Sequence, residues 1–458
     1  MAIWAFIVIA AVALFGFGVE RQKAIALRRA GAQLHSLPNY YGAVVSSRVF
    51  IPGICLLLLW ISLEQVALDW LVWTSLPVSV TENLLSAERD LLLNQIRQVA
   101  NGVVFGTPAT EVMLAAERLA HWRYLSGWLL FSCSASISVG CYLLARRRTT
   151  PQFRARQAFG RVLDGIMIVS ALVAIATTVG IVLSLLFEAQ RFFETVGIIE
   201  FLTGTRWEPQ IPIRADQVTA GGAFGAVGVF VGTILIASIA MAVAVPIGLV
   251  SAIYLSEFAP GSVRRIVKPV IEILAGVPTV VYGFFAVIIV APFLVGTGEV
   301  FGLDVAPNSA LAAGAVMGIM LIPFISSFSE DALAAVPQTM RDGSYALGAT
   351  QAETIVSVLL PAALPGIVGG VLLAVSRAIG ETMIVVMAAG LIANITANPF
   401  EGVTTVTVQI VTLLIGDTEF DNPKTLAAFA LGLILFVSTL ALNVVALKVV
   451  QKYRERYE

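Results

Sequence analysis

The stretch from Ser326 to Gly366 reads SSFSEDALAAVPQTMRDGSYALGATQAETIVSVLLPAALPG and separates two long apolar runs. It contains two short Ala-rich segments with helical character, which meet near Gly348. Because glycine and the polar residues around it favour a turn, we expect a helix-turn-helix. Arg341 is the only basic residue of the stretch, so it is not built as a membrane-surface anchor. We expect another protein to dock on it.

The composition around this stretch is that of an integral membrane protein. The 458 residues are 58% hydrophobic and 12% charged, whereas soluble domains carry about 25% charged residues. The net charge of −1 argues against nucleic-acid binding. The 3 cysteines fall inside apolar runs and only 2 histidines are present, which disfavours a metal site. We therefore expect an all-α protein embedded in membrane lipid.

Nine apolar runs are long enough to cross a membrane, which takes about 20 residues as a helix. We expect the first to be an uncleaved helix and no signal peptide, because no positive charge precedes it and Arg21 and Lys23 follow it. The predicted spans are residues 2–19, 50–73, 124–145, 162–187, 223–254, 268–295, 308–328, 363–392 and 425–447.

Charge in the connecting loops predicts the orientation. Of the 28 basic residues, 19 fall in one alternating set of loops and 8 in the other. Because basic loops are retained in the cytoplasm, we expect the N-terminus outside and the C-terminus inside. The remaining basic residue, Arg377, falls within a predicted span.

The spans divide into two groups. Residues 1–145 form an N-terminal extension with three spans and an external helical segment at about 74–122. Residues 146–161 form a basic cytoplasmic linker, and residues 162–458 form a six-helix core whose cytoplasmic loop covers 329–362. In the external segment, helical spacing of apolar residues predicts an amphipathic hairpin: Leu84, Leu85, Leu91, Leu92, Ile96 and Val99.

One ordered set of residues in the opening stretch resembles a known loop. The order is Asp342-Gly343-Ser344, three residues, Gly348, nine residues, Val358, one residue, Leu360-Pro361. It resembles the pattern E-A-A-x3-G-x9-I-x-L-P of the coupling loop of ABC importer permeases, although Asp, Gly and Ser replace Glu, Ala and Ala. The alternative is an ordinary amphipathic connector. The resemblance implies that this loop sits in a groove of a cytoplasmic ATPase.

The energy source would lie in that partner. The sequence has no Gly-Lys dipeptide, and hence no P-loop to hold ATP phosphates. ATP and Mg would therefore bind the partner ATPase, and this chain would carry no cofactor.

Three further stretches narrow the family. They are AIYLSEFAP at 252–260, AGVPTVVYGF at 275–284 and SRAIGETM at 376–383. Together they resemble the PstC and PstA permeases of the phosphate-specific ABC importer, whose patterns read AIYLxEYAP, AGIPSVVYG and RAxGET. Methionine after Gly-Glu-Thr favours the PstC type. The resemblance covers residues 160–458, and the part before it matches an extension of some bacterial members.

The resemblance implies an ABC importer type I (MetI-like) permease fold in the bacterial inner membrane, with three extra N-terminal helices. The chain would pair with a homologous PstA-like permease and two copies of a PstB-like ATPase. A periplasmic PstS-like protein would deliver phosphate, which crosses without covalent change, so the chain would not be an enzyme. An importer for sulfate or molybdate, or an ATP-independent transporter or channel, is the alternative.

Arg377 is the main candidate for contact with phosphate. A charge in mid-span costs at least about 2.5 to 3.5 kcal/mol, so it should face partners rather than lipid. Glu381, four residues on, would share its helix face and neutralise it. In the functional interpretation, Arg377 offers a guanidinium fork to phosphate, next to Glu381 and Thr382. In the structural alternative, Arg377 and Glu381 form an ion pair that fixes helix packing.

Two hydroxyl residues of the sixth span are further pathway candidates. Thr279 and Tyr282 lie beside Pro278, which frees a backbone carbonyl. Hydroxyl side chains in membrane helices also bond back to their own helix, which is the alternative.

The sequence leaves more than one role open for Glu257, for the N-terminal extension and for several glycines. Glu257 should face cytoplasmic water, with pairing to Arg264 or Arg265 as the alternative. The N-terminal extension could be a stabilising helical collar, a regulatory contact, an assembly surface or a dock for the binding protein. Several glycines should lie where helices approach closely, within the chain or at a partner permease: Gly228, Gly232, Gly366, Gly369 and Gly370.

Overall fold

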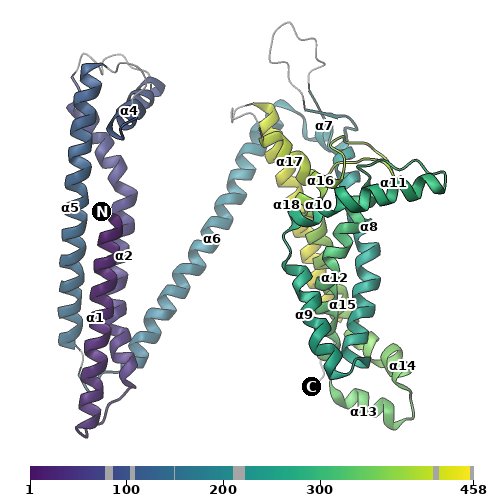
Figure 1. Cartoon of the computed structure of the whole chain (residues 1–458), viewed down its shortest axis with the longest axis horizontal. Helices are drawn as coiled ribbons and strands as arrows, with labels where there is room; N and C mark the ends of the chain where they lie inside the picture. Colours follow the sequence, from purple (N-terminus) through teal and green to yellow (C-terminus); the bar gives the residue numbers. More distant parts are fainter. Residues whose placement is uncertain (78–85, 104–108, 149, 210–221, 416–421, 454–458) are drawn as a thin grey trace. The chain divides into compact units, whose positions relative to one another are not determined.

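The computed structural model describes the chain except for residues 78–85, 104–108, 149, 210–221, 416–421 and 454–458 (Figure 1). The chain forms two compact units, Met1–Ala176 and Thr177–Glu458. Among the described residues, the elements are helices except for one antiparallel pair of short strands, β1 (Trp207–Glu208) and β2 (Ala223–Phe224). The predicted all-α class is confirmed.

Nine helical segments within the described residues are long and apolar enough to cross a membrane, as the sequence predicted. They are α1 (Ala2–Arg29), α2 (Pro38–Ser75), α5 (Thr110–Arg148), α6 (Ala155–Thr195), α8 (Val227–Ile253) continued by η1 (Tyr254–Phe258), α10 (Thr279–Phe285) continued by η2 (Ala286–Val290) and α11 (Ala291–Val300), α12 (Ala310–Ala334), α14 (Gln351–Thr354) continued by η3 (Ile355–Leu359) and α15 (Leu360–Ile379), and α18 (Pro423–Tyr453).

The sixth predicted span, residues 268–295, is wrong in its position. Residues Gly261–Gly276 form a separate helix, α9, and a new helix begins at Thr279. Pro278 causes the break, because it lacks a backbone N–H and restricts the residue before it to extended backbone. Val277 is extended accordingly, with φ −70° and ψ 129°.

The eighth predicted span, residues 363–392, is interrupted as well. The helix ends at Ile379, and Gly380 is its C-cap. A short helix, α16, covers Met383–Ala388, and α17 follows at Val406–Leu414. The single span predicted here therefore corresponds to two helices, and the break between them falls at Gly380-Glu381-Thr382.

In the unit Met1–Ala176, α1, α2 and α5 lie side by side (Figure 1). A further helix, α4 (Ser86–Ala100), packs on α2 and α5 through its buried Leu93 and Ile96. Of the residues that predicted a hairpin here, Ile96 is buried and Leu91 is exposed. Leu84 and Leu85 lie outside the described residues.

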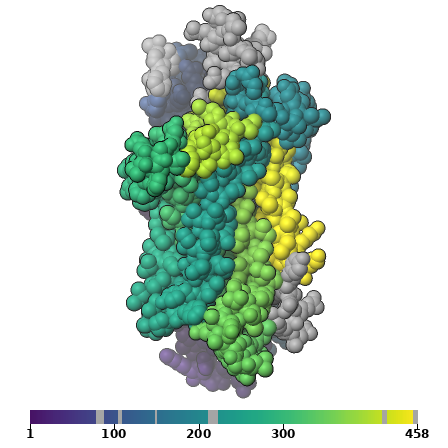
Figure 2. Space-filling view, turned by 90° about the vertical axis from the view of Figure 1, so that its right-hand side faces the viewer, coloured from purple at the N-terminus to yellow at the C-terminus, as the bar shows by residue number. Residues whose placement is uncertain are grey.

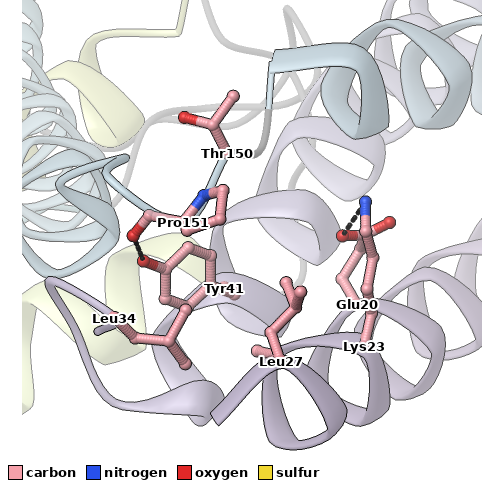
Figure 3. A pocket seen from close by; sticks show the side chains of 8 residues that line it. Glu20, Lys23, Leu27, Leu34, Tyr41, Thr150 and Pro151 are labelled. Carbon is pink, nitrogen blue, oxygen red and sulfur yellow. Dashed lines mark hydrogen bonds and ion pairs between the residues drawn. The ribbon is translucent and has the colours of Figure 1, made fainter. Parts of the chain in front are cut away.

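A small pocket in the same unit shows how the predicted linker is anchored (Figure 3). The Tyr41 hydroxyl of α2 donates a hydrogen bond of 2.8 Å to the carbonyl of Pro151. Glu20 of α1 is buried and forms ion pairs with Lys23 at 3.8 Å and Arg146 at 3.7 Å. Both α5 and α6 extend into the range 146–161. The segment is therefore a short connection tied to α1 and α2.

In the unit Thr177–Glu458, α8 packs along α12. Small residues make this contact close: a Cβ on Gly318 would lie 2.8 Å from the Cβ of Val243, and a Cβ on Gly248 would lie 2.9 Å from the Cβ of Ile325. Real Cβ atoms do not approach that closely, so larger residues at these glycines would force α8 and α12 apart.

The glycines expected at close contacts divide into two sets. Gly366 and Gly370 of α15 lie against α12, and Gly369 lies against α18, so these are helix–helix contacts. Gly228 and Gly232 of α8 instead lie against backbone outside helices, at Ala393 and Thr404.

Further named helices of this unit are α7 (Ile198–Thr203) and α13 (Gln338–Ala346).

Candidate functional site

Arg377 lies in the last turn of α15, and its side chain is exposed. Its Cζ atom lies 5.8 Å from the centroid of the Phe324 ring on α12, within the range of a cation–π interaction. Among the residues that the structure describes, no carboxylate lies within ion-pair distance of this guanidinium. Its positive charge is therefore open to a ligand or to another chain.

The expected ion pair between Arg377 and Glu381 is wrong. The pairing assumed one continuous helix, but α15 ends before Glu381 and the two residues share no helix face. The Glu381 Oε1 atom accepts hydrogen bonds from the backbone N–H groups of Met383 at 3.1 Å and Ile384 at 3.4 Å. A carboxylate satisfies such free N–H groups at the start of a helix. Glu381 therefore stabilises the start of α16.

Thr382 lies at the break itself and is half-buried. Its hydroxyl donates to the carbonyl of Gly380 at 3.4 Å. The structure thus brings Arg377, Glu381 and Thr382 to one helix break, but Arg377 is the member whose charged group stays exposed.

Tyr282 is buried, and its hydroxyl donates to the carbonyl of Leu274 on α9 at 2.8 Å. That carbonyl is the one that a continuous helix would have paired with the missing N–H of Pro278. The hydroxyl therefore joins the two helices on either side of the break. Thr279, the first residue of α10, is half-buried.

The stretches 275–284 and 376–383, which resemble those of phosphate importer permeases, contact each other. Gly283 of α10 lies against α16, where an added Cβ would be 2.8 Å from the Sδ atom of Met387 and 3.2 Å from the carbonyl oxygen of Met383. The glycine is needed because α10 and α16 leave no room for a side chain. The helix α10, which begins at Thr279, and the helix α16, which begins just after the break, therefore pack against each other.

A buried polar network behind this region was not expected from the sequence. The Thr407 hydroxyl donates to the carbonyl of Glu381 at 2.9 Å and lies 3.0 Å from the Thr405 hydroxyl. The backbone N–H of Val406 donates to the hydroxyl of Thr233 on α8 at 3.0 Å. The run Thr-Thr-Val-Thr-Val-Gln at 404–409 was the available signal, because hydroxyl residues are frequent helix N-caps.

At the other end of α15, the predicted helix-turn-helix is present. Asp342, Gly343 and Ser344 lie in α13, and Val358 lies in η3. Gly348 forms the turn with φ +86°, a conformation that glycine adopts without strain. Leu360 and Pro361 are the first residues of α15.

The tip of this turn carries two large exposed side chains. Leu347 is 91% exposed, and Tyr345 is exposed beside it. The hydroxyls of Ser344 and Thr354 lie 2.9 Å apart and join α13 to α14. An exposed leucine on a small, internally bonded pair of helices is suited to insertion into a groove of a partner.

Both expectations for Glu257 are wrong. Its carboxylate forms an ion pair of 3.1 Å with Arg341 of α13, and both side chains are nearly buried. Arg264 instead pairs with Glu330 of α12. The sequence argument considered only neighbours along the chain, whereas the partner of Glu257 is far away in sequence.

One helical segment connects the two regions. Gln351–Ile379 is a segment of 29 residues, which at about 1.5 Å per residue is about 43 Å long. One end adjoins the exposed turn at Gly348, and the other carries Arg377. The exposed turn and the helix break beside Arg377 are therefore the two ends of one helical segment.

Two family models match this chain. A family model described as "Phosphate ATP-binding cassette transporter" matches residues 6–177. Another, described as "Binding-protein-dependent transport system inner membrane component", matches residues 244–455. The first match covers the N-terminal extension and the linker and ends within α6, and the second lies within the core.

Individual relatives point the same way. The chain is 35% identical to the probable ABC transporter permease protein YqgH of Bacillus subtilis, over 60% of this chain and 85% of that protein. It is 32% identical to the phosphate transport system permease protein PstC of Mesorhizobium japonicum over the same shares. With PstC 1 of Mycobacterium tuberculosis the identity is 33%, over 56% and 82%. The chain belongs to the PstC-type family of phosphate ABC transporter permeases.

Proposed function

We propose that this chain forms the path of inorganic phosphate across the bacterial inner membrane, together with a homologous PstA-like permease. The observation that carries the proposal is Arg377, an exposed guanidinium at the broken end of a membrane-length helix. A charged side chain within a membrane-spanning helix costs free energy, and such residues therefore mark functional sites. Because the chain belongs to a family of phosphate transporter permeases, phosphate is the anion that we expect to bind this charge.

Arg377 has no carboxylate partner among the described residues, and phosphate would serve as the anion that pairs with it. The planar guanidinium presents several N–H donors that match two oxygens of the anion. Phe324 supports the guanidinium from one side. Because no described carboxylate pairs with Arg377, phosphate need not break an ion pair on arrival. Thr279 and Thr382, half-buried in the same region, are proposed to line the path, whereas the Tyr282 hydroxyl holds α10 to α9.

The residues of the turn are proposed to couple this path to ATP. Two copies of a PstB-like ATPase would dock on the permease pair, with ATP and Mg bound to the ATPase. On this chain the docking surface would be formed by Asp342, Gly343, Ser344 and Gly348. Val358, Leu360 and Pro361 would belong to the first part of the helical segment Gln351–Ile379 that follows the turn. Closure of the ATPases would push α13 and α14 and thereby move α15 and Arg377.

The proposal includes an orientation. The basic loops and the turn at Gly348 would face the cytoplasm, as would the C-terminus, and the N-terminus would lie outside. The PstS-like binding protein would deliver phosphate from the periplasm to the outer end of the permease pair. The chain would move phosphate and leave hydrolysis to its partner.

The test is transport by the complete complex in vesicles. Wild-type complex should accumulate radioactive phosphate only when ATP and the ATPase subunit are present, and a tenfold excess of sulfate or molybdate should not compete. Uptake that persists without the ATPase would favour a channel or secondary transporter. Competition by sulfate or molybdate would favour an importer for another oxyanion.

A further inference from the structure

The ion pair between Glu257 and Arg341 joins two elements that are far apart in the sequence. Arg341 Nη2 lies 3.1 Å from Glu257 Oε1, and the two side chains are 12% and 9% exposed. Solvent screens such a pair weakly. Removal of one partner leaves an unpaired charge in a nearly buried site, so each side chain depends strongly on the other.

Arg341 also binds the end of α12. Its Nη1 atom donates to the carbonyl of Val336 at 3.0 Å, and its Nη2 atom donates to the carbonyl of Leu333 at 2.9 Å. These carbonyls lie at the C-terminal end of α12, where the helix leaves backbone acceptors without partners. One arginine of α13 therefore holds together α13, the end of α12 and η1.

The second helix of the turn is tied to the same point. The side-chain amide of Gln351, the first residue of α14, donates to the backbone carbonyl of Glu257 at 2.5 Å. The Ser256 hydroxyl donates to the Glu257 carboxylate at 2.9 Å and helps to orient it. Both α13 and α14 are therefore bonded to η1, the last turn of the α8 segment.

The other end of α8 reaches the region of Arg377. In Figures 1 and 2, α13 and α14 lie at one end of this unit, and α16 and α17 lie at the other. Thr233 of α8 accepts a hydrogen bond from the N–H of Val406, and Thr407 donates to the carbonyl of Glu381. Hydrogen-bonded contacts thus join the turn to the helix break through α8, in addition to the direct connection through α15.

From this geometry we infer that Glu257 is a positioning residue that makes the turn move with α8. With the Glu257–Arg341 pair in place, a push on α13 displaces α8 and α15 together, and the break beside Arg377 moves as a unit. Without the pair, only the Gln351 hydrogen bond and helix packing join the turn to α8, so α8 follows the turn less closely, and less phosphate is moved for each ATP hydrolysed. The inference rests on the proposed coupling to an ATPase.

The test is a double-mutant cycle in the complete complex in vesicles. Phosphate uptake and ATP hydrolysis are measured together for the wild type, Glu257→Gln, Arg341→Gln and the double variant. Each single variant should lower uptake per ATP hydrolysed by about tenfold, and the double variant should be no worse than the more severe single one. Glu272→Gln and Arg265→Gln, which change exposed residues of α9, should match the wild type.

A second readout does not need transport. Amide hydrogen exchange of α13 and α14 in the purified complex should be faster in both single variants than in the wild type. Wild-type complex without phosphate uptake would contradict the proposed function, and the exchange rates would still decide the positioning role.

Several results would overturn the inference. One is an unchanged ratio of uptake to hydrolysis in both single variants. Others are effects that add up in the double variant, or exchange rates equal to those of the wild type. Loss of assembly in all three variants would also overturn it, because the pair would then serve folding alone.

Discussion

The two ends of the segment Gln351–Ile379 are held in different ways. At the first end, the turn itself is formed by residues close in sequence: Gly348 makes the turn, and Thr350 and Glu353 form a capping box with reciprocal hydrogen bonds. Its distant contacts are made at one point, Glu257, which binds Arg341 and Gln351. At the second end, the partners are distant: Thr407 bonds the carbonyl of Glu381, and α10 packs on α16. The first end is a small unit that a partner can move, and the second depends on several segments at once.

The largest effect on assembly should come from Gly232, beside the second end. In Gly232→Ala the new Cβ would lie 2.1 Å from the carbonyl oxygen of Thr404, so α8 and this backbone must separate. Overpacking of this kind costs about 1 to 3 kcal/mol. We expect the temperature at which half the purified complex is lost to fall by several degrees.

The matched control for Gly232 is Gly180→Ala in α6, where nothing lies within 4 Å of the added Cβ. In a helix this exchange is favourable by about 1 kcal/mol. Equal stability of the Gly232 and Gly180 variants would show that the contact between α8 and Thr404 does not hold the second end.

At the first end of the segment, we expect substitution of Gly348 to affect phosphate uptake more than the stability of the complex. Its φ of +86° is unfavourable for other residues, least so for asparagine and most for β-branched ones. Gly348→Val should lower phosphate uptake by about tenfold through strain of about 1 to 2 kcal/mol at the turn. Gly348→Asn should lose much less, and the thermal stability of the complex should fall by no more than a few degrees in Gly348→Val and by less in Gly348→Asn. If valine and asparagine have equal effects, backbone conformation is not what the turn requires.

The smallest effect should follow removal of the Tyr282 hydroxyl. In Tyr282→Phe the carbonyl of Leu274 still accepts from the N–H of Val277 at 3.3 Å, so no buried acceptor is left unpaired. We expect a loss of stability of about 1 kcal/mol or less and uptake within about twofold of the wild type. A large loss of uptake with normal stability would instead place this hydroxyl in the phosphate path.

The same contrast explains what the sequence could predict. The turn at Gly348 and the number of membrane-length segments follow from local spacing and composition, and the structure confirms the turn and, within the residues it describes, nine such segments. The positions of the sixth and eighth segments were wrong. The break after Ile379 was missed because the apolar residues on either side of Gly380-Glu381-Thr382 were assigned to one span, and the pairing assigned to Glu381 failed with that assignment. The partner of Glu257 was missed for a related reason, since Arg341 approaches only after α12 and α13 have packed.

The measurement that tests the account most directly is phosphate uptake by Arg377→Gln complex in vesicles, with the amount of assembled complex determined in the same preparation. We expect assembly to be normal and uptake to fall by about 100-fold or more, because the neutral amide cannot replace the guanidinium as a partner of a doubly charged anion. Arg265→Gln should leave both unchanged. Normal uptake by Arg377→Gln would contradict the account, and loss of assembly would show that Arg377 serves the fold.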